Sequence, residues 1–347
     1  MSLPPDPTNL AADRLAKDAH LPASTSRRRF WVVGLTLALA AILLYLALRE
    51  VDWNVFLAVL RQGHYAMLPL LFGLSSLNFF IRSLRWRVLL TAERRLPVST
   101  VFWADMVGYL GNTFLPARAG ELIRSAALGY NAQISTSFVL ATALTERLMD
   151  VIALVLICTL ALLALPGIPT MFSDALQGMA LMALLGLAIL LIMPLLQDLF
   201  QRLLMVLPLP ASWRTRVVNL LVRFLDGMRS LQNPGRALTF ILFTSVIWLL
   251  DGFGSVLCAA MLNLQLSLPQ ALILLAGLGL SSALPSTPGY VGVYQFVAVM
   301  ILEPFGFSAS EAVAYIMVTQ VLGYLVIGFW GVLGVWQLNM KNRLREN

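Results

Sequence analysis

A broken, charged stretch within an apolar chain is the feature that most constrains this protein. Residues 108–124 read GYLGNTFLPARAGELIR and lie among segments long enough to cross a membrane. Pro116 removes a backbone donor and disfavours a helical conformation at the preceding residue. Arg118, Glu121 and Arg124 follow at helical spacing, which aligns three charges on one helix face. At membrane depth such a break requires burial in protein or a wet cavity, and its charges indicate a binding site or pathway. The alternative is a cytoplasmic interfacial loop whose charges lie in water.

The composition is that of a polytopic membrane protein. Of the 347 residues, 59% are hydrophobic and 12% are charged, against about 25% charged residues in soluble domains. Several apolar runs reach the roughly 20 residues that cross a bilayer. The net charge of +7 would also suit nucleic-acid binding. The arginines, however, gather in every second loop between the apolar segments, as the positive-inside rule predicts for a membrane protein. Cys158 and Cys258 fall within apolar runs and no residues have metal-ligand spacing, so we expect no disulfide, metal or cofactor.

Loops rich in basic residues alternate along the chain with loops that are acidic or neutral, and this predicts which side of the membrane each loop lies on. We expect a disordered cytoplasmic tail at 1–26, one transmembrane domain at 27–340 and a second cytoplasmic tail at 341–347. Residues 49–64 would form an outer loop. Residues 198–236 predict an amphipathic helix on the cytoplasmic leaflet, or equally a solvated face packed under the bundle. Full spans are predicted at 30–48, 65–81, 135–165, 178–196, 237–262 and 312–338.

Two broken elements predict re-entrant helical hairpins. The first joins 98–115 to a short helix at 118–130, and the second covers 269–304 and contains LPSTPGYVGVYQF. The expected fold is therefore all-α, with about six full spans, two re-entrant hairpins entering from opposite faces, and both termini in the cytoplasm. Transporters build substrate sites from opposed broken helices near the midplane, because half-helix N-termini offer free N–H groups to an anion.

Further charges lie inside predicted spans. Glu146, Arg147 and Asp150 share one apolar helix, and Asp251 lies in another. Because charges are costly in lipid, we expect these groups to face the bundle, where the acids would pair with the arginines of the first hairpin. A network that only fixes helix register is the structural alternative. For Asp251 the alternatives are a proton-coupling site and a neutral, hydrogen-bonded carboxyl.

Four stretches in combination resemble a known family. In chain order they are RSLRWRVLL, GYLGNTFLPARAGELIR, TERLMD and LPSTPGYVGVYQF, and the similarity to the lysylphosphatidylglycerol synthase transmembrane family, or flippase-like membrane domain family, covers about residues 28–335. Members resemble the flippase half of the bacterial multiple peptide resistance factor, which moves aminoacylated phosphatidylglycerol between leaflets. The resemblance implies eight membrane segments, two of them re-entrant, and a lipid substrate.

The sequence departs from the best-known relatives in one respect. No soluble aminoacyltransferase domain follows the membrane part, so we do not expect this chain to make lysyl-lipid. Stand-alone members of the family are often tied to other lipids, including polyprenyl-phosphate-linked sugars and hopanoids. The lipid could therefore be a phospholipid, an aminoacyl-phospholipid or a polyprenyl-phosphate-linked lipid.

These observations predict a flippase of the cytoplasmic (inner) membrane for a phosphate-containing lipid. Arg118 and Arg124 would bind phosphate, because the planar guanidinium matches phosphate oxygens. Arg82 and Arg85 would either hold lipid phosphate or anchor the helix at the interface, and Asp251 would couple protons. The other predicted substrate-binding residues are Asn112, Glu121, Glu146, Arg147, Asp150, Ser286, Thr287 and Tyr290.

Two other classes of function fit part of the sequence. A membrane enzyme acting on a lipid-linked sugar or phosphate would need acids near water, and the outer loops offer only Asp174, Glu303 and Glu311. An accessory subunit of a lipid synthase would leave the charged broken helix unexplained. A homodimer and a separate lipid-modifying synthase are partners that the sequence leaves open, whereas nucleic acid is not expected.

Overall fold

The computed structural model describes residues 24–115, 119–165, 230–282 and 287–346, with a few single positions between 172 and 188. Within these ranges all regular structure is helical, which confirms the all-α prediction. The predicted span at 178–196 and the predicted amphipathic segment at 198–236 lie mostly outside the described residues, as does most of the predicted 1–26 tail.

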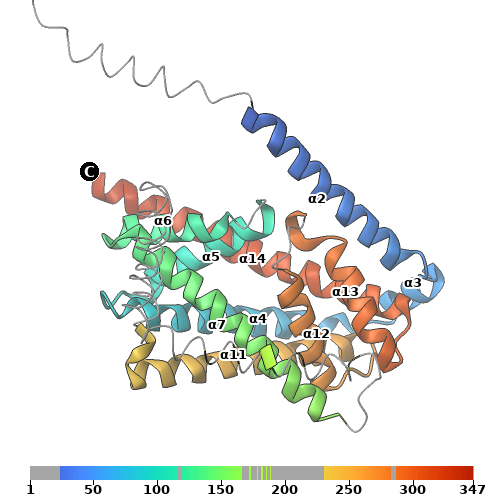
Figure 1. Ribbon diagram of the computed structural model, residues 1–347. Helices are drawn as coiled ribbons and strands as arrows, with labels where there is room; N and C mark the ends of the chain where they lie inside the picture. The colour runs from blue at the N-terminus through green and yellow to red at the C-terminus, as the bar shows by residue number, and fades with distance from the viewer. Residues whose placement is uncertain are drawn as a thin grey trace, which may run out of the picture.

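Five long helices dominate the described part of the fold (Figure 1). Three helical stretches within it are long and apolar enough to cross a membrane, Tyr65–Leu90, Pro234–Met261 and Ala309–Met340. Large hydrophobic side chains are exposed along them, which is the arrangement that a lipid environment stabilises. The long helices are α2 (Ser24–Leu48), α4 (Leu68–Leu90), α7 (Thr136–Leu163), α11 (Pro234–Met261) and α14 (Ala309–Glu346).

Shorter helices form two packed pairs, α5 (Val98–Phe114) with α6 (Gly120–Ala132), and α12 (Leu268–Ser281) with α13 (Val293–Leu302). The first pair is antiparallel. A Cβ added at Gly111 of α5 would meet Gly120, near the start of α6, and one added at Gly108 would meet Arg124 one turn further along. In the second pair, a Cβ at Gly277 of α12 would meet the side chain of Ile301 on α13. The residues that connect each pair, 116–118 and 283–286, lie outside the described ranges.

Two boundaries differ from the sequence predictions. The predicted outer loop at 49–64 contains a helix, α3 (Trp53–Arg61), which the carboxylate of Asp52 caps by accepting from the backbone N–H of Asn54 at 2.8 Å. The second span continues past Ile81 to Leu90, so the arginines that were expected beyond its end lie on the helix itself. Short 3-10 turns complete the described part: η1 (Tyr65–Met67), η3 (Ser230–Gln232), η4 (Pro288–Tyr290) and η5 (Glu303–Phe305).

The packing brings the two helix pairs together. Helix α14 lies along α5, and Gly331 allows the close approach, because a Cβ there would come within 2.7 Å of the Leu110 Cβ. The turn η4, which precedes α13, also contacts α5. The break in the second pair therefore lies beside the first pair, and polar groups of both face one region of the bundle.

Candidate functional site

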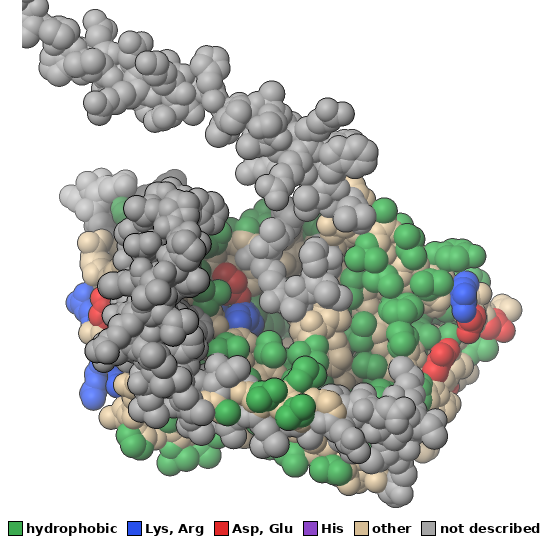
Figure 2. All heavy atoms as spheres, in the orientation of Figure 1, with side chains coloured by type: hydrophobic (Ala, Val, Ile, Leu, Met, Phe, Trp, Pro, Cys, Tyr) green, Lys and Arg blue, Asp and Glu red, His purple; other side chains and the backbone are tan. Residues whose placement is uncertain are grey.

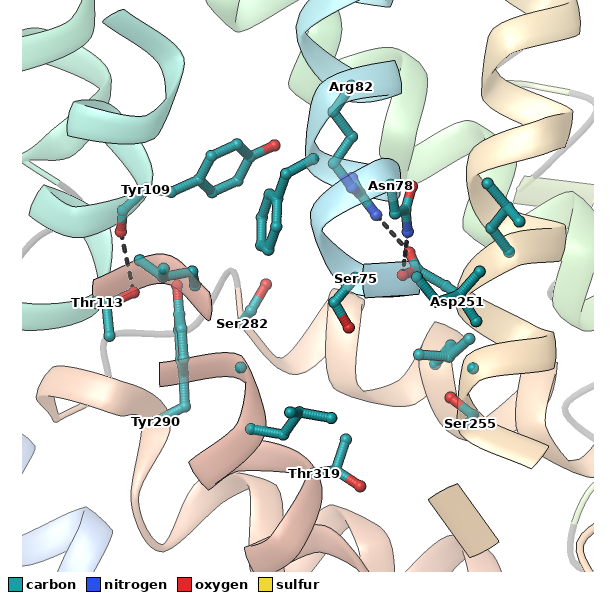
Figure 3. Close-up of a pocket in the computed structure, with 18 of the residues that line it drawn as sticks. Ser75, Asn78, Arg82, Tyr109, Thr113, Asp251, Ser255, Ser282, Tyr290 and Thr319 are labelled. Atoms are coloured by element: carbon teal, nitrogen blue, oxygen red, sulfur yellow. Dashed lines mark hydrogen bonds and ion pairs between the residues drawn. The ribbon is translucent and has the colours of Figure 1, made fainter. Parts of the chain in front are cut away.

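A cavity of about 360 Å³ lies where the two helix pairs meet (Figure 3). Helices α4, α5, α11 and α14 contribute to its wall, together with the start of α6 and the turn η4. Charged side chains are visible in a hollow among hydrophobic ones on one face of the molecule (Figure 2). The neutral polar residues of the cavity wall are Ser75, Asn78, Tyr109, Asn112, Thr113, Ser255, Ser282, Tyr290, Tyr294 and Thr319.

An ion pair between α4 and α11 forms one side of the cavity. The guanidinium of Arg82 donates to Asp251 at 2.5 Å, and Asn78 donates its amide N–H to the other oxygen of the same carboxylate. Arg82 also lies 5.3 Å from the centre of the Trp248 ring. Both charged side chains keep some exposed surface, 13% for Arg82 and 27% for Asp251. They are therefore fixed in position and remain accessible from the cavity.

A second ion pair, between α6 and α7, also lines the cavity. Arg147 donates from Nε to Glu121 at 2.7 Å, and Asn112 donates to the same carboxylate oxygen at 3.2 Å. The guanidinium lies 5.9 Å from the centre of the Tyr109 ring. Arg147 is 28% exposed. The cavity thus presents two guanidinium groups, Arg82 held by Asp251 and Arg147 held by Glu121, with Asp150 a further 3.7 Å from Arg147.

Behind this wall lies a network of largely buried charges. Arg124 forms ion pairs with Asp105 at 2.6 Å, with Glu121 at 2.6 Å and with Glu146 at 3.0 Å. Arg85 pairs with Glu146 at 2.9 Å and with Asp150 at 2.5 Å. Removing charges from water is costly, and the cost is recovered only where each charge has close partners, as here.

The buried network joins helices that are far apart in the sequence. Glu146 bridges the two arginines, so it links α4 and α6 to α7, while Asp105 adds α5. Trp86 strengthens the junction, because its ring lies 4.4 Å from the Arg124 guanidinium and its N–H donates to Thr142. The network therefore fixes the helices that carry the cavity's own arginines.

The predicted site residues divide into three groups. Those that line the cavity are Arg82, Asn112, Glu121, Arg147, Asp251 and Tyr290. Those that belong to the buried network are Arg85, Arg124, Glu146 and Asp150. Thr287 belongs to neither, since its hydroxyl donates to the carbonyl of Val291 at 2.8 Å. Arg118 and Ser286 lie outside the described residues. The expected pairing of the acids of α7 with an arginine of the first hairpin is present between Glu146 and Arg124.

Several residues of the site were missed in the sequence. Asp105 is a carboxylate within an apolar helix, so the rule that singled out Asp251 would have found it too. Asn78 and Tyr109 carry no such signal, because single amide and phenol groups are common in membrane helices. Their place at the cavity follows from the way the helices pack.

The break in the second pair holds a stack of two tyrosines. The rings of Tyr290 and Tyr294 are nearly parallel, with centroids 4.8 Å apart. Tyr290 has a φ of 59°, a conformation that non-glycine residues rarely adopt. The neighbouring carbonyl of Gly289 accepts from Gln320 at 3.0 Å and from the Tyr324 hydroxyl, which ties the turn to α14. This anchoring holds Tyr290 against the cavity (Figure 3).

The cavity can hold a polar group through charge-assisted hydrogen bonds. It offers guanidinium, amide and hydroxyl donors, together with the carboxylates of Glu121 and Asp251, around a volume that would accommodate a phosphate and its substituents. Among the described residues no group of three or more His, Cys, Asp and Glu side chains is arranged to hold a metal.

Comparison with known proteins gives one match. The family described as "Lysylphosphatidylglycerol synthase TM region" matches residues 31–331. No curated protein and no solved structure matches the chain. The family match covers every described residue of the cavity and of the buried network, and it confirms the resemblance drawn from the sequence motifs.

Proposed function

The chain belongs to the lysylphosphatidylglycerol synthase transmembrane family, and on that basis we propose that it moves a phosphate-containing lipid between the leaflets of the cytoplasmic (inner) membrane. The observation that carries the proposal is the pair of accessible guanidinium groups, Arg82 and Arg147, in a polar cavity within an apolar bundle. The headgroup would enter this cavity while the acyl or prenyl tails stay in lipid.

The division of arginines supports specific roles. Arg82 and Arg147 would bind the lipid phosphate, because both line the cavity and both retain exposed surface there. Arg124 would not bind phosphate, although its helical spacing predicts that role, because its guanidinium is 1% exposed and surrounded by three carboxylates. It would hold α5, α6 and α7 in register around the cavity.

The helix pairs support a re-entrant arrangement. The helices have 17 and 13 residues in the first pair, and 14 and 10 in the second, against the roughly 20 that an ordinary span needs. We propose that each pair enters and leaves by the same face, with the two pairs entering from opposite faces. Both termini would lie in the cytoplasm.

A lipid-movement assay in proteoliposomes tests the assignment of Arg82. Arg82→Gln would leave Asp251 unpaired, so the informative protein is Arg82→Gln/Asp251→Asn, in which the local charge stays balanced. We expect this variant to fold and to move an anionic phospholipid at least about tenfold more slowly, as the loss of one charge-assisted hydrogen bond implies. Asp251→Asn keeps the guanidinium and is expected to retain movement.

The control is Arg61→Gln, which changes an exposed arginine on α3. It removes the same charge and leaves the cavity intact. Wild-type rates in the folded Arg82→Gln/Asp251→Asn protein would remove Arg82 from the site. If Arg147→Gln also moved lipid at the wild-type rate, the proposed headgroup site as a whole would be wrong.

Asp251 is proposed as the proton-coupling group, because it is the accessible partner of Arg82. Phosphate binding to Arg82 would weaken the ion pair and favour protonation of the carboxylate. Asp251→Asn should therefore still equilibrate lipid between leaflets but lose any response to an imposed pH gradient. An unchanged response would assign coupling to another group.

A further inference from the structure

A second hollow, of about 500 Å³, lies at the end of the bundle where α4 ends and α11 begins (Figure 1). Its wall is formed by Arg87, Thr91, Arg95, Asn233 and Arg236. Three of these five residues are arginines and none is acidic. We call it the basic pocket. It shares no lining residue with the cavity described above.

The arginines of the basic pocket differ from those inside the bundle. Arg82, Arg85, Arg124 and Arg147 each contact at least one carboxylate. Within the described ranges, the arginines of the pocket contact none. Arg87 donates from Nε to the carbonyl of Leu96 at 2.6 Å, which fixes the side chain and leaves its terminal N–H groups without a partner among the described residues.

Arg236 adds a second sign that the pocket lacks a partner. Its Nε is buried, and no described residue accepts from it. A buried donor without an acceptor costs free energy, and natural proteins leave few of them. Arg95, by contrast, is exposed at the rim. An anion between the three guanidinium groups would satisfy the donor and reduce the repulsion among like charges.

The local fold reinforces the positive potential. Asn233 caps α11 by accepting from the backbone N–H of Arg236 at 3.1 Å, so the helix begins at the pocket. The N-terminus of a helix carries a partial positive charge, which adds to that of the side chains. The pocket residues lie at or just beyond the ends of two helices, Tyr65–Leu90 and Pro234–Met261, that are long and apolar enough to cross a membrane. The pocket thus lies where a helix leaves the apolar region.

We propose that the basic pocket binds a phosphate group, separately from any lipid carried through the cavity. Guanidinium groups prefer phosphate because its oxygens accept paired N–H bonds. Two sources could supply it, the headgroup of an anionic membrane lipid and a soluble phosphate. The position at the end of two apolar helices places lipid headgroups within reach, and basic pockets between membrane helices bind such headgroups in other proteins.

The test uses the full-length protein in nanodiscs and measures its thermal midpoint and its bound lipid by native mass spectrometry. Nanodiscs contain phosphatidylcholine alone or with phosphatidylglycerol, and a third series adds inorganic phosphate to phosphatidylcholine nanodiscs. The variants are Arg87→Gln/Arg236→Gln and Arg95→Gln. Arg61→Gln is the matched control, an exposed arginine near the other end of α4.

We expect phosphatidylglycerol to bind the wild-type protein and to raise its midpoint. The double variant should weaken that binding at least about tenfold, Arg95→Gln should weaken it less, and Arg61→Gln should leave it unchanged. If inorganic phosphate reproduces the effect and the variants abolish it, the phosphate site stands and its ligand is soluble. Arg95→Gln is exposed and makes no described contact, so it tests the site even if the double variant fails to fold.

Two results would overturn the proposal. One is equal binding of phosphatidylglycerol to the wild type and to all folded variants. The other is binding of phosphatidylcholine and phosphatidylglycerol alike that neither Arg87→Gln/Arg236→Gln nor inorganic phosphate reduces, which would make the arginines a general interfacial anchor. Because the pocket and the cavity share no residue, either result leaves the proposed lipid movement untouched.

Discussion

Gly111 of α5 lies directly against Gly120 of α6, so closely that a Cβ added to Gly111 would come within 2.9 Å of the Gly120 Cα. One turn away, a Cβ on Gly108 would lie 2.7 Å from the Cβ of Arg124. Small residues allow membrane helices to approach at the backbone. This approach carries Arg124 to the carboxylate of Asp105 on α5, so the glycines determine the geometry of the charges.

Substitution of Gly120 tests this close packing. In Gly120→Ala the new methyl group would overlap the Gly108 carbonyl oxygen and lie 2.5 Å from the Asn112 backbone nitrogen. Backbone atoms cannot yield without separating the helices, so we expect a loss of about 1–3 kcal/mol in the free energy of unfolding. Thermal unfolding in detergent measures it. Gly73→Ala on α4 is the control, since nothing lies within 4 Å of its added Cβ; an alanine there should be neutral or slightly stabilising. Equal melting of the two variants would contradict the packing.

Arg124 and Arg147 should respond differently to the same substitution. Arg124→Gln would leave Asp105, Glu121 and Glu146 without a shared cation in a buried site, at a cost of about 3–5 kcal/mol. Arg124→Lys should also destabilise, because one ammonium lacks the planar fork that reaches three carboxylates. Arg147→Gln should cost less, since its side chain is partly exposed to the cavity.

The yield of folded protein and the midpoint of thermal unfolding separate these cases. Arg124→Gln/Asp105→Asn is the informative partner variant, because removing one charge of each sign should recover part of the lost stability. An Arg124→Gln protein as stable as Arg147→Gln would show that the buried network contributes little.

Cysteine labelling tests whether the cavity contains water. Ser75 and Cys258 line the cavity, whereas Cys158 packs in a hydrophobic cluster elsewhere. In a Cys258→Ser background, Ser75→Cys should react with a small water-soluble thiol reagent while Cys158 stays unmodified. Mass spectrometry of the intact protein reports both rates in one sample. Equal protection of both thiols in folded protein would indicate a dry interior.

The topology can be tested with a cysteine at each end of the bundle. Glu93 follows α4 and Gln62 follows α3, and both are exposed. In a background without Cys158 and Cys258, we expect an impermeant thiol reagent applied to intact cells to label Gln62→Cys and to label Glu93→Cys only after lysis. The reverse pattern would invert the orientation that the arginines predict.

Much of the described fold follows from patterns that can be read directly in the sequence. A long apolar run that follows a residue able to cap a helix indicates a helix. Ser135 and Asn233 accordingly cap the starts of α7 and α11. Pro116 and Gly120 similarly mark the break between α5 and α6. The end of α4 was missed because runs of arginine normally signal water. Here Arg82 and Arg85 are neutralised by acids of α7 and α11, and only the packed structure shows this.

The same limit applies to the candidate site. The sequence identifies charged residues that membrane burial makes expensive, and Glu146, Arg147, Asp150 and Asp251 were found in this way. The spacing of residues on one helix does not determine which arginine faces the cavity and which is enclosed by carboxylates, because that depends on how the neighbouring helices pack. Arg124 has the spacing of a ligand-binding residue, and the structure encloses it in carboxylates.

The ion pair between Arg82 and Asp251 gives the cavity an internal anion of its own. If the chain moves a phosphate lipid as we propose, the phosphate would replace this carboxylate at Arg82, so loading would be an exchange of one anion for another. The net gain in free energy would then be the small difference between two similar interactions, which would favour rapid release on the far side. Each release would restore the internal pair, so such a carrier would reset without presenting a bare cation to the hydrocarbon.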